Sequence, residues 1–471
     1  MKRKQNLPRS ERGSLLLAAM ILTLAISISL VSFLKLGQTN LNISNRAFYA
    51  NATMNLAESG LEEAMWSIGK AVDGDAAAWN SWTLSGNAAW RNFTNYTFDA
   101  NSTGNVRVYV RNYSLAAAPV VVARATITPA TGPSVEKWVT VSLFQRSLFA
   151  NGLVAKNNLT FSGGNASVDS YDSRQGVYNA SLGGGAYNRY DRGSAGSASV
   201  SVSSFSLSNS SIWGNVSIGT SDYSGLSVGP NGLVGDFSAT SGTVDYTRVN
   251  TDFTTNFDDA SAPTVAGIVI GGIGGATVLP RGGDAPAADG KYYYDVTGIS
   301  LSGPASRILS VAPGNDVVVR ITAPSGASGV SITGNASIQV LAGSTLEMYT
   351  ESNVSIAGGG IANSNDPAAF QLWSTRPSGA TGTQSISVSG NGQLSAIVYA
   401  PNADVTMNGG GSSGNVYGAV VADTISVTGG SDFHYDEALS AMSSGNPFGV
   451  SLWSELTTAA QRSTWSSVLS F

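Results

Sequence analysis

The segment that most constrains the fold of this chain is an uncharged, largely apolar run that extends from Ser14 to Leu34. At about 1.5 Å per residue, a helix of this length crosses a bilayer core of about 30 Å. The flank before the run is basic, with Glu11 as its only acid, and such a flank keeps the N-terminus on the cytoplasmic side. The sequence therefore predicts that everything after Lys35 is exported.

Three interpretations fit this segment. A secretory signal peptide has a shorter apolar core of about 7–15 residues and a small-residue cleavage site, whereas this run ends in Leu34-Lys35-Leu36. An ordinary signal anchor fits the length. The third interpretation, which we favour, starts from the border itself: the basic leader 1–13 ends in Gly13 and the apolar run begins at Ser14. This border resembles the type III leader of type IV pilins and pseudopilins.

That resemblance implies that a prepilin peptidase cuts between Gly13 and Ser14, that the new N-terminus is methylated, and that the helix stays attached. The helix would serve first as an inner-membrane anchor and later as part of a filament core at the cell surface. Its predicted membrane and filament residues are Leu15, Leu16, Leu17, Ala18, Ile21, Leu22, Leu24, Ile26, Ile28, Leu30, Val31, Phe33 and Leu34.

A helical pattern continues beyond the apolar run and predicts one long helix over 14–70. Ala57, Leu61, Ala64, Met65 and Ile68 recur at the spacing of an amphipathic helix. The runs Arg46–Tyr49 and Ala57-Glu58-Ser59-Gly60-Leu61-Glu62-Glu63-Ala64 resemble the N-terminal region of PilX-type pilus assembly proteins. The resemblance implies that the partners are other pilin-like subunits, the pilus assembly machinery and the prepilin peptidase.

The chain from 71 to 147 is strand-like and predicts a small pilin-like β region after the helix. Val106, Val108 and Val110 alternate strictly, and Val120–Ile127 is a further strand candidate.

An internal repeat then defines a second domain over 148–440. Its unit is apolar, Ser or Thr, apolar, any residue, Gly, and then Gly or Asn. Two apolar residues around one hydroxyl residue form a short strand with one inward face, and the glycine permits a sharp turn. Recurrence near 20 residues predicts coils of a parallel β-solenoid, with a β-sandwich as the alternative. The copies are 159–164, 330–335, 354–359, 386–391, 405–410 and 425–430, with a weaker one at 299–304.

The predicted fold class is therefore mainly β, with a long N-terminal helix, a pilin-like α+β region and a solenoid. Residues 441–471 are predicted to be a C-terminal tail. Within the solenoid, Ala396–Val405, Gly418–Ala422 and Phe433–Leu439 resemble a β-helical domain of uncharacterised function that commonly follows PilX-type N-termini. This resemblance covers about 296–440 and implies no activity.

Composition limits the function classes. Only 12% of residues are charged and the net charge is −5, with no basic cluster outside the leader, so nucleic acid is not an expected partner. There are no cysteines and a single histidine, His434, so the sequence predicts neither disulfides nor a zinc site. No cofactor or metal site is predicted. We expect His434 to be a hydrogen-bonded or packed residue.

We do not predict an enzyme, because no catalytic motif is present, although many β-helices bind or cleave polysaccharides. The weaker alternative function is thus a membrane-anchored protein that binds or cleaves a surface polysaccharide. Its candidate carboxylates are Asp432 with Asp436 and Glu437. The alternative, purely structural interpretation of this cluster is a turn that caps the solenoid. Two other candidate pairs are Asp169 with Asp172 and Asp258 with Asp259.

The leading hypothesis is a non-enzymatic minor pilin-like subunit that presents its solenoid for adhesion or assembly, with a polysaccharide or a host molecule as a possible ligand. Counted from Ser14, the fifth residue is Ala18, where most pilins carry a glutamate. This departure and the bulk of the solenoid predict a place at or near a filament tip.

Overall fold

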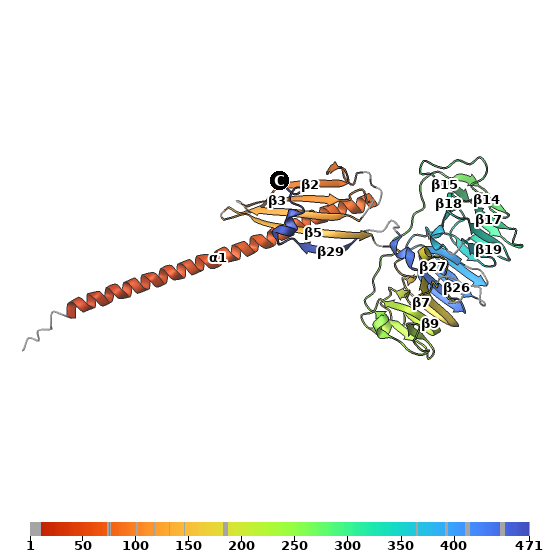
Figure 1. Ribbon diagram of the computed structural model, residues 1–471, viewed down its shortest axis with the longest axis horizontal. Helices are drawn as coiled ribbons and strands as arrows, with labels where there is room; N and C mark the ends of the chain where they lie inside the picture. The colour runs from red at the N-terminus through yellow and green to blue at the C-terminus, as the bar shows by residue number, and fades with distance from the viewer. Residues whose placement is uncertain are drawn as a thin grey trace, which may run out of the picture. The chain divides into compact units, whose positions relative to one another are not determined.

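The computed structural model describes residues 11–72, 75, 77–99, 102–115, 118–130, 132–145, 147–181, 187–363, 366–390, 394–409, 415–442 and 448–470. Contacts divide the chain into two units (Figure 1): 1–146 together with 445–471, and 147–444. The predicted fold class is confirmed, because the chain is mainly β, has one long apolar N-terminal helix and contains a large parallel-stranded solenoid. Residues 1–10 of the predicted leader lie outside the described residues.

Helix α1 is continuous from Glu11 to Val72 and passes Gly37 without a break. From Ser14 to Phe48 every side chain is exposed. Further along, the predicted amphipathic stripe turns inward: Ala57, Leu61, Ala64 and Ile68 are buried, and Met65 is half-buried. The helix therefore has one half without protein contacts in this chain and one half that belongs to a folded core.

The second half of α1 packs on a six-stranded antiparallel sheet (Figure 1). Alternating valines on β3 and alternating apolar residues on β4 and β5 face the helix and close the core. This alternation is what the strand pattern of the sequence predicts. In spatial order the strands are β1 (Thr83–Ser85), β2 (Ala88–Asp99), β3 (Ser102–Arg111), β4 (Val120–Thr128), β5 (Val135–Gln145) and β29 (Phe448–Glu455).

The prediction of a C-terminal tail over 441–471 was wrong. Strand β29 pairs with β5 and completes the sheet, because the outer edge of β5 offers unpaired N–H and C=O groups to another strand. Helix α2 (Ala459–Ser463) follows, and Leu456 and Leu469 pack with Val122 and Trp138 on the sheet face away from α1. The alternating run from Phe448 to Leu452 was the local signal for this strand. The solenoid is thus inserted, in sequence, between two neighbouring strands of one sheet.

The second unit is a parallel β-solenoid whose repeats stack in register. Ile299 pairs with Val330, Val330 with Val354, Val354 with Ile386, and the ladder continues through Val405 and Ile425 to Leu159. In each described copy the apolar residues are buried and the hydroxyl residue between them is more exposed, as in β22. Parallel pairing of equivalent residues confirms the solenoid over the sandwich. The final motif positions 391 and 410 lie outside the described residues.

The coils do not stack in chain order. The chain enters at β6 and β7, adds β8–β12 on one side, and then runs through 251–267 to β13 at the far end. From β13 it returns coil by coil until β27 pairs with β6 and β7 and β28 pairs with β7. The first and last coils are therefore neighbours (Figure 1), which brings the two ends of the insertion together.

The elements of the solenoid have the following bounds. The strands are β6 (Leu153–Ala155), β7 (Leu159–Tyr171), β8 (Gly193–Ser197), β9 (Phe205–Ile218), β10 (Leu226–Val228), β11 (Leu233–Gly235), β12 (Val249–Asn250), β13 (Ile268–Ile270), β14 (Thr277–Leu279), β15 (Tyr292–Val296), β16 (Ile299–Leu301), β17 (Ile308–Val311), β18 (Asp316–Ile321), β19 (Ser328–Ile332), β20 (Ser337–Val340), β21 (Thr345–Thr350), β22 (Asn353–Ile356), β23 (Ile361–Ala362), β24 (Phe370–Ser374), β25 (Gln384–Gly390), β26 (Leu394–Gly409), β27 (Val416–Gly429) and β28 (Phe433–Asp436). Short 3₁₀ turns are η1 (Ser173–Gln175), η2 (Tyr223–Gly225), η3 (Tyr246–Arg248), η4 (Pro367–Ala369) and η5 (Glu437–Ala441).

Candidate functional site

The exposed half of α1 is the first candidate functional surface. All of the predicted membrane and filament residues are exposed, from Leu15 at 75% to Leu34 at 62%. The helix is long and apolar enough to cross a membrane, with a mean hydropathy of 2.5 in its most apolar window. Gly13 and Ser14 both lie within the helix. Cleavage between them stays a prediction.

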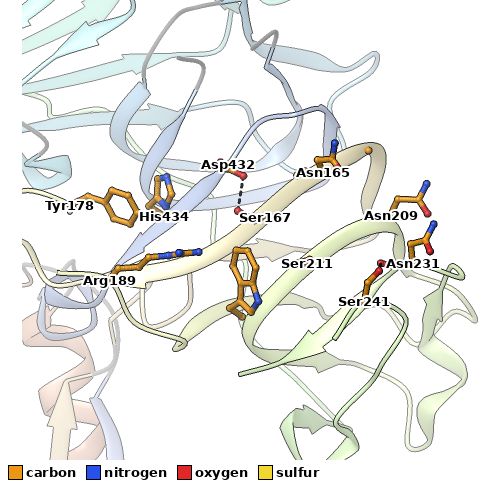
Figure 2. Close-up of a pocket in the computed structure, with 13 residues that line it drawn as sticks. Asn165, Ser167, Tyr178, Arg189, Asn209, Ser211, Asn231, Ser241, Asp432 and His434 are labelled. Atoms are coloured by element: carbon orange, nitrogen blue, oxygen red, sulfur yellow. Dashed lines mark hydrogen bonds between the residues drawn. The ribbon is translucent and has the colours of Figure 1, made fainter. Parts of the chain in front are cut away.

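The second candidate site is a groove on the solenoid, with a volume of about 690 Å³ (Figure 2). It lies where β7 and β9 turn from one face of the coil to the next, beside β28. Its lining residues are Gly164, Asn165, Ala166, Ser167, Tyr178, Arg189, Asn209, Ser211, Trp213, Asn231, Ser241, Asp432 and His434.

A buried carboxylate organises one end of the groove. Asp169 on β7 and His434 on β28 are cross-strand neighbours, and the Asp169 Oδ1–His434 Nδ1 distance is 2.5 Å. The other oxygen, Oδ2, accepts hydrogen bonds from Arg189 Nε at 2.5 Å and from the Tyr178 hydroxyl at 3.0 Å. Asp169 has no exposed surface, and a buried charge is costly unless it is paired and hydrogen-bonded. These partners therefore have a structural role that holds the end of the groove together.

Aromatic rings fix the positions of these polar groups. The Tyr178 ring lies 3.9 Å from the His434 ring between centroids, and the Tyr417 ring lies 4.8 Å from it. The Arg189 guanidinium lies 4.7 Å from the ring centroid of Trp213 and 4.6 Å from that of Phe237. Burial raises the pKa of Tyr178 above its ordinary value, so its hydroxyl stays protonated and donates to Asp169.

Several polar atoms at this end have no partner in the described part of the chain. His434 is 2% exposed, and its Nε2 makes no hydrogen bond with any described residue. Arg189 uses Nε for Asp169, while its two terminal nitrogens form no hydrogen bond within the described ranges. Asp432 accepts from the Ser167 hydroxyl at 2.6 Å through Oδ1. The groove thus holds donors and acceptors that a ligand or water would satisfy.

The predicted carboxylate cluster does not form one site. Asp432 lines the groove, whereas Asp436 and Glu437 are not among its lining residues. Asp436 is the N-cap of η5, and its Oδ1 accepts from the N–H groups of Ser173 and Ala438. Glu437 accepts from the Ser170 hydroxyl and from Arg192 Nε. The capping interpretation therefore holds for Asp436.

The residues of the other two candidate carboxylate pairs have structural roles. Asp172 caps η1, and its hydrogen bonds with Arg174 lower the pKa of Asp172 to about 2. Asp169 instead belongs to the buried network. Asp258 and Asp259 lie in the crossing segment 251–267: the Tyr399 hydroxyl donates to the Asp258 carbonyl, and Asn402 donates to the Asp259 carboxylate. They fasten this segment to the solenoid.

Asp436 carries a prediction about pH. Burial raises the pKa of Asp436 above its ordinary value of 3.8, and its Oδ2 has no partner among the described residues. Between the two pKa values the unfolded chain has lost a proton that the native state keeps, so this group lowers stability as pH rises. Asp436→Asn keeps a capping oxygen and removes that titration. We expect the free energy of unfolding of D436N, minus that of the wild type, to grow from about pH 4 upward.

Urea titrations at a series of pH values would measure this difference. Asp316→Asn, at an exposed position of the same unit, is the control. A difference for D436N that does not change with pH would contradict the prediction.

Sequence reasoning missed most of the groove. The expectation of a hydrogen-bonded His434 is confirmed, but its partner Asp169 lies 265 residues away. Arg189 and Trp213 were not singled out, and no spacing pattern marks them. Within the described residues, no group of three or more His, Cys, Asp or Glu side chains is placed to hold a metal ion.

Comparisons with known proteins give limited matches. Residues 237–442 match the family described as Domain of unknown function (DUF7305), which leaves β7, β9 and Arg189 outside the matched range. No curated protein matches the chain. A solved structure, the competence-associated pilin ComZ from Thermus thermophilus, aligns with 87% of this chain and 96% of its own, at 12% identity and a TM-score of 0.18. A score this low carries no argument about fold or function.

Proposed function

We propose that the protein is a non-enzymatic, pilin-like surface subunit that is held in the membrane, and then in a filament, through the exposed half of α1. The observation that carries this proposal is the division of α1 itself. Between Ser14 and Leu34 the helix exposes a continuous, largely apolar surface, whereas from Leu56 onward it packs into the core of an antiparallel sheet. An apolar surface of that length needs lipid or other apolar helices around it.

The position of the solenoid in the chain fits a display role. It is inserted between β5 and β29, which remain paired with each other, so the sheet is complete with the solenoid present. Resemblance to PilX-type pilus assembly proteins supports the same partners: other pilin-like subunits, the assembly machinery and a prepilin peptidase. Adhesion or assembly at the cell surface is then the role of the displayed unit.

We place the subunit at or near a filament tip. In most pilins the fifth residue of the mature chain is a glutamate that pairs with the N-terminal amine of a neighbouring subunit, and the fifth residue from Ser14 in this chain is Ala18. A subunit at the end of a filament has a neighbour on one side only, so it does not need this glutamate–amine pair on the other side. Immunogold labelling of filaments would show label at ends; label at regular intervals along the shaft would oppose this placement.

The mature N-terminus tests the main proposal. We expect mass spectrometry of the protein from cells to find Ser14 as the first residue, carrying an N-methyl group. Gly13→Val should block cleavage, because the pilin-like leader ends in the glycine that directly precedes the cut. Gly37→Val should leave processing intact. Gly37 lies on the exposed helix, and a Cβ added there would meet no heavy atom within 4 Å. An intact Met1, or a cut beyond Lys35, would refute the proposal.

The second candidate function is a membrane-anchored protein that binds or cleaves a polysaccharide, and the groove is the observation that favours it. Hydrolysis by paired carboxylates needs two of them about 5–9.5 Å apart across the scissile bond. Among the described lining residues Asp432 is the one carboxylate, and the buried Asp169 is engaged by Tyr178, Arg189 and His434. The groove therefore favours binding over cleavage.

A further inference from the structure

We infer that the groove is a binding site for a neutral oligosaccharide, with one row of amides and one end built from Trp213, Arg189 and His434. This inference deepens the polysaccharide-binding role proposed above. It does not depend on cleavage after Gly13 or on a place in a filament.

The first support is a row of three free amides. Asn165 follows Gly164 on β7, Gly164 pairs with Asn209 on β9, and Asn231 follows β10, which pairs with β9 in turn. The three side chains are exposed and form no hydrogen bond with any described residue. Figure 2 shows Asn165, Asn209 and Asn231 together at one end of the groove.

The geometry of this row suits a chain of hydroxyl groups. Neighbouring strands lie about 4.8 Å apart, so amides on or beside the successive strands β7, β9 and β10 lie within reach of one extended ligand. Each amide has a donor and an acceptor, as a sugar hydroxyl does, and a pair of such groups satisfies both. A purely apolar ligand would leave these amides unpaired.

The second support lies at the opposite end, where Tyr178, Arg189 and His434 gather in Figure 2. Nε2 of His434 is buried, lines the groove and has no partner within the described residues. The guanidinium of Arg189 keeps two nitrogens free and is held in place by Asp169 and two rings. Trp213 is half-buried and lines the groove, and the part of its ring that Arg189 and Phe237 leave exposed can contact the apolar side of a ring-shaped ligand.

The charges select a neutral ligand. The groove and the buried network at its end hold two carboxylates, those of Asp432 and Asp169, and one guanidinium, that of Arg189. Asp169 already balances Arg189, so Asp432 remains as a net negative charge. A polyanion such as an acidic polysaccharide or a nucleic acid would meet this carboxylate without a cationic patch to offset it.

The test is a titration of the full-length protein in detergent micelles by isothermal calorimetry. The neutral probes are cellotetraose, chitotetraose, maltotetraose and mannotetraose, and the acidic probe is tetragalacturonate. We expect at least one neutral probe to bind and tetragalacturonate to bind more weakly than it. Trp213→Ala, Asn209→Ala and Asn231→Ala should each weaken binding of that probe by about tenfold or more, which corresponds to about 1.4 kcal/mol.

Asn335→Ala is the matched control, because Asn335 is an exposed corner residue of the same solenoid outside the groove, and it should bind like the wild type. If W213A does not fold, the two exposed asparagine variants decide. Absence of binding by every neutral probe would overturn the inference. Equal affinity of N209A, N231A and the wild type for the neutral probe would also overturn it. So would tighter binding of tetragalacturonate than of every neutral probe. A protein that binds a neutral probe but does not begin at Ser14 would keep this inference and lose the pilin-like proposal.

Discussion

Replacing Asp169 with alanine is expected to lower the free energy of unfolding of the solenoid by about 3–5 kcal/mol, the cost of breaking a buried, hydrogen-bonded charge pair. Asp169 is fully buried and accepts from Arg189 and Tyr178 while it contacts His434 Nδ1 at 2.5 Å. Its removal leaves a guanidinium at 23% side-chain exposure without its carboxylate. It also removes the side-chain contact between Asp169 of β7 and His434 of β28, two strands whose backbones are paired.

Hydrogen exchange measured by mass spectrometry against urea would follow this loss in the peptides of β7 and β28. Local exchange is the suitable readout, because a chain with two units need not unfold in one step. Asp316→Ala removes an exposed carboxylate from the same solenoid and should change stability by no more than about 0.5 kcal/mol. If D169A were as stable as D316A, the buried network would not contribute to the stability of the paired first and last coils.

Gly358→Ala is expected to destabilise the solenoid by about 2–5 kcal/mol, from two separate causes. Gly358 has φ +69°, where an L-residue costs about 1–2 kcal/mol. In addition, a Cβ on Gly358 would lie 1.9 Å from the carbonyl oxygen of Gly334 in the neighbouring coil. Relieving such an overlap requires backbone movement, at a typical cost of about 1–3 kcal/mol.

Gly343→Ala separates the two causes. Gly343 has φ +72° in the same unit, and a Cβ added there would have no heavy atom within 4 Å. We expect G343A to show the conformational cost alone, about 1–2 kcal/mol. Urea midpoints and hydrogen exchange in β19 and β22 would compare the variants. Equal losses for G358A and G343A would mean that close approach between coils does not contribute.

The glycine of the repeat illustrates what local pattern predicts and what it leaves out. Its recurrence after each short strand predicts a turn with positive φ, and Gly358 and Gly429 have this conformation. The stacking adds a second requirement. A Cβ on Gly429 would lie 2.2 Å from the carbonyl oxygen of Gly409 in the next coil. This constraint depends on which coils are neighbours and is invisible in any one copy.

The sequence by itself determined the elements. The apolar run predicts a membrane-spanning helix, because a continuous apolar stretch is visible in adjacent residues. The repeat predicts stacked strands, because each copy has one apolar face to bury. The ladder from Ile299 to Leu159 follows that pattern in register. These properties are local in the chain, so they are encoded in short stretches of it.

Only the tertiary structure decided the order of the coils, the closure of the sheet and the groove. Strand β29 completes a sheet whose other strands end at Gln145, and Asp169 meets His434 across 265 positions. Arg189 and Trp213 join them from a loop and a different coil. Strand edges and buried charges are stabilised by partners that lie far away in the chain. Pairing of this kind produces no periodic pattern in the sequence.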